Sequence, residues 1–77
     1  MRRISLVRLK ANCKGKVAEI LDGGNLQNKL ANMGVHKGKE VTKLSHIGLR
    51  CPIVIRAGRS ILALGHGVAN KVMVETE

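Results

Sequence analysis

The sequence contains no phenylalanine, tyrosine or tryptophan, so its 77 residues must build a hydrophobic core from aliphatic side chains. The lack of aromatic residues argues against two kinds of binding site. One is a proline-peptide groove, which aromatic rings line, and the other is a platform on which nucleic-acid bases stack. At this length we expect a single domain over 1–77, near the lower limit of what folds without disulfides or a metal.

Cysteine and acidic residues are also scarce. Two cysteines, Cys13 and Cys51, are too few for a disulfide framework and predict two thiols in a reducing cytosol. The five acidic residues are scattered, so no paired carboxylates indicate acid–base catalysis, and we expect neither catalytic residues nor enzyme activity. No stretch reaches the roughly 18 apolar residues of a membrane span. Arg8 and Lys10 interrupt the first apolar run too early for a signal peptide.

Basic residues, in contrast, are abundant. Fourteen lysines and arginines give a formal net charge of +9, which suits an anionic partner such as nucleic acid, an anionic membrane surface or an acidic protein face. These residues are spread along the chain, and a need for solubility would also account for them. The charge therefore indicates an anionic partner but does not identify which kind.

Residues 25–41 predict a short helix that is followed by a turn and a strand. Leu26, Leu30 and Met33 have the i, i+4, i+7 spacing of one helical face, which predicts a helix over 25–33. We expect Asn25 to cap its N-terminus and Gly34 to end it in a left-handed conformation. The sequence on both sides indicates β structure, so the helix must pack on a sheet.

Short apolar runs separated by glycine-containing turns predict a mainly β fold, a small and strongly bent barrel of five to six short strands. The expected strands cover 4–9, 16–21, 40–46, 52–56, 60–64 and 71–75. Turns are expected at 11–15 and 57–59, and a break at 65–70, for which one turn of 3₁₀ helix is an option. A slip in the inward pattern between Val17 and Ile20 indicates a β-bulge, and Val72 and Val74 should share one face. Closure of the barrel would protect the edges of the sheet.

The ordered set of these positions resembles the ferrous-iron transport protein A (FeoA) family of SH3-like barrels. The matching positions are Leu6-x-x-Leu9, Gly15-Lys16-Val17, Gly23-Gly24, Lys29-Leu30-x-x-Met33-Gly34-Val35-x-x-Gly38-x-x-Val41, Pro52-Ile53-x-Ile55, Gly58, Ile61-x-Ala63-Leu64, Ala69 and Val72-x-Val74. The most specific part is the helix, glycine and turn unit over 30–38, joined to Ala63-Leu64 and Ala69. Single glycines would mean little, whereas the ordered set spans nearly the whole chain.

The resemblance implies a small cytosolic accessory protein of bacterial ferrous iron uptake, without cofactor or chemistry of its own. Its partner would be the cytoplasmic part of a ferrous-iron permease with a GTP-binding domain, of the FeoB type. It would be peripheral to the membrane only through that permease, and self-association is left open. The module also resembles the C-terminal domain of metal-dependent repressors. Exposed polar and basic positions are the candidate partner contacts: Lys29, Asn32, His36, Lys37 and Arg50.

Two other classes of function stay open. Gly15-Lys16-Val17 resembles the strand start of KOW-type RNA-binding or ribosome-binding barrels. Because the chain has no aromatic residues, such binding would be weak and salt-dependent, so we expect no stable nucleic-acid complex. Diffuse attachment to a membrane surface through charge is the second. The link to iron suggests transition-metal binding as a further function. The candidate ligands are Cys13, His36, His46, Cys51 and His66. They lack the close spacing of a metal site, so we assign none of them as a metal ligand.

Overall fold

In the part of the chain that the structure describes, alternating apolar residues in short runs form six antiparallel strands, as expected for a mainly β chain. The computed structural model describes residues 2–22, 24–45 and 52–76. The strands are β1 (Arg2–Ser5), β2 (Lys14–Ile20), β3 (Glu40–Ser45), β4 (Ile53–Ala57), β5 (Ser60–Leu64) and β6 (Val72–Thr76), and the helices are α1 (Asn25–Asn32) and α2 (His66–Ala69).

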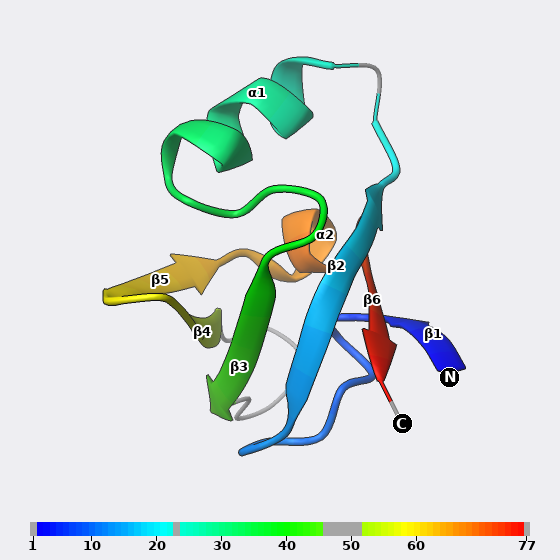
Figure 1. Ribbon diagram of the computed structural model, residues 1–77, viewed down its shortest axis with the longest axis vertical. Helices are drawn as coiled ribbons and strands as arrows, with labels where there is room; N and C mark the ends of the chain where they lie inside the picture. Colours follow the sequence, from blue (N-terminus) through cyan, green and yellow to red (C-terminus); the bar gives the residue numbers. More distant parts are fainter. Residues whose placement is uncertain (1, 23, 46–51, 77) are drawn as a thin grey trace.

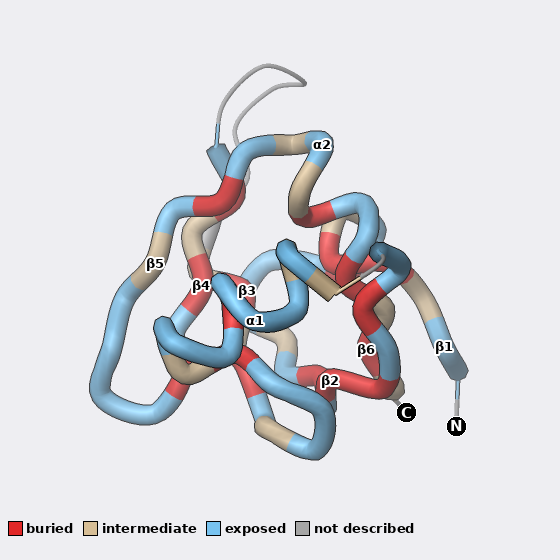
Figure 2. The backbone as a smooth tube through the Cα atoms, turned by 90° about the horizontal axis from the view of Figure 1, so that it is seen from above, coloured by how far each residue is buried: buried red, intermediate tan, exposed pale blue. Residues whose placement is uncertain are grey.

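The strands form one sheet in the order β1-β6-β2-β3-β4-β5, which bends strongly around a common interior (Figure 1). Seen from above, α1 lies across the opening of the bent sheet (Figure 2). The predicted SH3-like barrel with a short helix packed on it is therefore confirmed. The expected full closure is not seen, because β1 and β5 are the outer strands and no hydrogen-bonded pairing joins them within the described residues.

The interior is filled by aliphatic side chains, as a sequence without aromatic residues requires. The central members have exposed fractions of 1% or less and come from β2, β3, β4, β6, α1 and two loops: Leu6, Val17, Leu30, Val35, Val41, Ile53, Ile55, Val72 and Val74. Because sequence-distant runs share this one cluster, the chain is held together mainly by apolar burial between strands.

Several local predictions are confirmed. The register between β2 and β6 shifts between Val17 and Glu19, where the parity of the sequence indicated a bulge. The two-residue turn at Gly58-Arg59 joins β4 to β5, with Gly58 at a φ of 63°. Val72 and Val74 are both buried on the inner face of β6.

Other boundaries were wrong. The first strand covers Arg2–Ser5 rather than 4–9, because the chain turns at 6–8 and buries Leu6 and Leu9 at the end of the sheet. β2 already begins at Lys14, which the sequence had indicated as part of a turn. The expected break at 65–70 is present, and the helical turn in it is α-helical, α2, instead of 3₁₀. The loop over 46–51 lies outside the described residues.

Helix α1 ends one residue before the predicted boundary, with the predicted left-handed Gly34 after it, and it begins differently. Its N-cap is Gly24, with a φ of 117° and no side-chain cap, so Asn25 is the first helical residue rather than the capping one. At the other end Gly34 has a φ of 90°, and its N–H donates to the carbonyl of Ala31 at 3.0 Å. The N–H of Val35 donates to the carbonyl of Leu30 at 2.8 Å, which completes a Schellman motif.

No described helix is long and apolar enough to cross a lipid bilayer.

Candidate partner-binding surface

The end of α1 and the turn after it present four of the five predicted contact residues to solvent. Lys29 and Asn32 lie on the exposed side of α1, while Leu30 between them is 1% exposed and anchors the helix in the core. His36 and Lys37 follow in the turn and are also exposed. The fifth candidate, Arg50, lies outside the described residues.

The turn that carries His36 and Lys37 is fixed to β2 by backbone hydrogen bonds. The N–H of Gly38 donates to the carbonyl of Val17 at 2.8 Å, and the N–H of Val17 donates to the carbonyl of Lys39 at 2.9 Å. Within the turn the N–H of Lys39 donates to the carbonyl of His36 at 3.0 Å. These bonds hold the backbone of the turn in one conformation, so the Lys37 side chain extends from a fixed backbone position.

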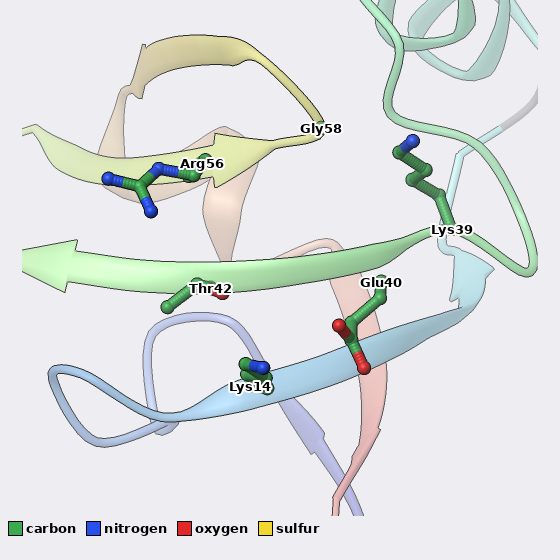
Figure 3. Close-up of a pocket in the computed structure, with 6 residues that line it drawn as sticks. All are labelled: Lys14, Lys39, Glu40, Thr42, Arg56 and Gly58. Atoms are coloured by element: carbon green, nitrogen blue, oxygen red, sulfur yellow. The ribbon is translucent and has the colours of Figure 1, made fainter.

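A second basic surface lies on the outer face of β2, β3 and β4. It is a hollow of about 320 Å³ lined by Lys14, Lys39, Glu40, Thr42, Arg56 and Gly58 (Figure 3). Our sequence reasoning missed this group. Lys14 had been placed in a turn, and strand alternation alone does not tell which basic residues of different strands become neighbours. The alternation of Val41 with Glu40 and Thr42 was the available signal, since it places the polar pair on the outer face.

Lys43 is a buried lysine that the sequence did not single out. Its side chain is 1% exposed, and its Nζ donates a hydrogen bond to the backbone carbonyl of Val7 at 2.9 Å. Burial lowers the pKa of this amino group from its usual value, because the apolar surroundings disfavour the charged form. Lys43 therefore acts inside the barrel and is not available as a surface contact.

The candidate metal ligands do not gather. Among residues 2–22, 24–45 and 52–76, no three histidine, cysteine or acidic side chains lie close enough together to hold a metal ion. Cys13 is a half-buried free thiol packed against the core, and His36 is exposed in the turn after α1. His66 is half-buried at the start of α2. His46 and Cys51 lie outside the described residues.

Comparison with known proteins gives one consistent result. The FeoA domain family matches residues 4–76. The chain is similar to an iron uptake regulatory protein, FeoA, with 33% identity, 97% of each chain covered and a TM-score of 0.86. A comparison with curated protein sequences gave no significant match.

Two further solved structures share the fold. A zinc-bound FeoA from Stenotrophomonas maltophilia, described as an SH3 domain protein and suggested to be a ferrous iron transport activating factor, is 24% identical, with 94% of this chain and 89% of that chain covered and a TM-score of 0.80. A manganese-dependent transcriptional repressor bound to manganese is 17% identical, with 100% of this chain but 38% of the repressor covered and a TM-score of 0.88.

Proposed function

Because this chain belongs to the FeoA domain family, we propose that it is a cytoplasmic accessory protein that binds the cytoplasmic part of a GTP-binding ferrous-iron permease. Membership of the family links the protein to ferrous iron transport. The observation that carries the proposal is the family match over 4–76. This range includes both helices and every strand of the sheet except the first residues of β1. The end-to-end similarity to an iron uptake regulatory protein supports it.

The exposed surface formed by α1 and its following turn is the proposed contact. Lys29, Asn32, His36 and Lys37 are all exposed there, and Arg50 is kept as a fifth candidate. Two of them are lysines, which suit an acidic face on the permease. The Schellman motif and the hydrogen bonds to β2 give this surface a defined backbone, so little ordering entropy is lost when a partner binds.

The proposed mechanism is regulatory and needs no catalytic group in this chain. Docking would shift the permease between conformations and so change nucleotide turnover or transport. Such an effect requires the accessory protein to bind one permease conformation more tightly than the other. The nucleotide chemistry and the translocation of iron would belong to the permease.

The test is a pull-down with tagged protein from membrane and soluble extracts of its own cell, at low and at moderate salt. We expect recovery of a large GTP-binding membrane permease that survives moderate salt, since a specific interface combines charge with apolar contact. Lys29→Glu and Lys37→Glu should reduce the recovery, and Lys71→Glu, which makes the same charge change on an exposed lysine outside α1 and its following turn, should not. Recovery of RNA alone, lost at moderate salt, would overturn the proposal in favour of a nucleic-acid-binding barrel.

A further inference from the structure

The hollow on the outer face of the sheet is built around a row of three side chains on three adjacent strands. Lys14 on β2 is the register partner of Thr42 on β3, and Thr42 is the register partner of Arg56 on β4. Residues directly opposite one another in antiparallel strands point to the same face. Val41 and Lys43, the neighbours of Thr42 along β3, are buried, so the row faces outward (Figure 3).

Lys39 and Gly58 close the hollow at one end. The amino nitrogen of Lys39 lies over Gly58, where it would come within 3.2 Å of a Cβ atom added to the glycine. Gly58 has a φ of 63°, and its lack of a side chain leaves room beneath that amino group. The sheet thus offers two cationic groups at the row itself and a third at its rim.

These cations are not neutralised within the described part of the chain. Lys14, Lys39 and Arg56 form no ion pair there, although Glu40 also lines the hollow. Glu40 is the register partner of Lys16 on β2, so a further lysine stands across from the one carboxylate. The hollow therefore keeps an excess of positive charge with a hydroxyl, that of Thr42, in its middle.

The shape and chemistry of the hollow favour carboxylates on an extended protein segment over a nucleotide or a nucleic acid. The row crosses two strand spacings, which is about 10 Å, while alternate residues of an extended peptide point the same way about 7 Å apart. Two carboxylates at such spacing can meet Lys14 and Arg56 together, the arginine through a bidentate pair. A nucleobase would find no aromatic ring on which to stack, because the sequence has none.

We propose that this basic hollow, lined by Lys14, Lys39, Thr42 and Arg56, binds an acidic, extended segment of a partner protein. Glu40 sets the register of the segment, since it repels a carboxylate placed at its end of the hollow. The hollow shares none of the five residues of the proposed permease contact, although Lys39 follows Lys37 by two positions at the end of the same turn. A test on purified protein, with variants of Lys14 and Arg56 that lie outside the proposed permease contact, separates this inference from the permease proposal.

The test is a fluorescence anisotropy titration of the purified full chain with a labelled peptide of about ten residues in which glutamate alternates with serine. We expect saturable binding that is lost when glutamine replaces the glutamates. Lys14→Glu and Arg56→Glu should each weaken binding about fivefold, and Glu40→Gln should strengthen it about twofold. Lys71→Glu is the matched control, because it makes the same charge change on an exposed lysine at the opposite end of β2, and it should leave the affinity unchanged.

Three outcomes would overturn the proposal. Equal weakening by Lys71→Glu would mean diffuse attraction to the net charge. Weakening by Glu40→Gln would mean that the carboxylate favours binding of the ligand instead of repelling it. A labelled oligouridylate that binds more tightly than the peptide, with the same sensitivity to Lys14→Glu and Arg56→Glu, would assign the hollow to phosphates of RNA. Circular dichroism of each variant checks that the sheet is intact, and Thr42→Val provides an uncharged variant that should weaken binding without changing net charge.

Discussion

The amino group of Lys43 donates a hydrogen bond to the backbone carbonyl of Val7, 2.9 Å away, from a side chain that is 1% exposed. This bond connects β3, one of the two central strands of the sheet, to the turn that follows β1. A lysine at an inward position of a central strand loses hydration of its charged amino group. This desolvation lowers the pKa of the amino group. The relationship makes the stability of the barrel depend on pH.

Stability should rise with pH in the alkaline range because of Lys43. Its pKa is lowered in the folded state, so between that value and the usual 10.5 the unfolded chain holds a proton that the folded chain has released. The free energy of unfolding therefore increases through this window and falls back as the pH drops through the folded pKa. Urea denaturation of wild type and Lys43→Met, from neutral pH to above 10.5, measures how the difference in their free energies of unfolding changes with pH. A constant difference between the two proteins would contradict the prediction.

Replacing Gly34 with alanine should destabilise the protein by about 1–2 kcal/mol, because a side chain at positive φ is strained. Gly34 has a φ of 90°, and a Cβ atom there would meet nothing within 4 Å, so strain is the only cost. Gly65→Ala is the matched control: its φ is −60° and its surroundings are also open, which predicts a change within about 0.5 kcal/mol. Urea denaturation compares the two, and equal losses would refute the role of φ.

Gly15→Ala should destabilise for a different reason, crowding between β2 and β6. A Cβ atom at Gly15 would lie 2.9 Å from Cβ and Cγ2 of Val74, closer than side chains pack. We expect a loss of about 1–3 kcal/mol, the usual cost of overpacking a core. The double variant with Val74→Ala should lose less than the sum of the two single variants, because the removed methyl groups make room. Additive losses in thermal or urea denaturation would argue against direct contact.

Leu30→Ala should cost about 2–5 kcal/mol, since Leu30 is 1% exposed and its truncation leaves a cavity under α1. Met33→Ala offers a comparison on the same helical face, and because Met33 is 36% exposed we expect a loss of less than about 1 kcal/mol. Equilibrium urea denaturation measures both. Similar losses would mean that the two side chains contribute equally to the packing of α1.

Lys29→Glu and Lys37→Glu should lower ferrous iron uptake in cells that depend on this protein, without changing its melting temperature by more than about 2 °C. Both side chains are exposed, so the variants should fold normally, and charge reversal should weaken docking on an acidic face. Lys71→Glu serves as the control in the same uptake assay. Full uptake by both variants would exclude this surface as the contact.

Features that depend on residues close together in sequence were predicted correctly. The spacing of Leu26, Leu30 and Met33 predicted α1, although Met33 caps the helix and is 36% exposed. Gly34 predicted the end of the helix, and the slip near Val17 predicted the bulge. Each of these follows from the local preferences of the backbone or from a short-range pattern. Asn25 failed as a cap because Gly24 could adopt a φ of 117° and occupy that position, and the sequence did not indicate which of the two would do so.

The sequence by itself determined an aliphatic core, a mainly β fold and a strong positive charge, because composition and periodicity alone decide these. The tertiary structure alone decided which charges become neighbours. Register brings Lys14 and Arg56 to the two sides of Thr42, although 42 positions of sequence separate the outer two. It also turned Lys43 inward toward Val7. The physical reason is that strand pairing is set by the burial of the opposite face, so the polar face takes the arrangement that the core imposes.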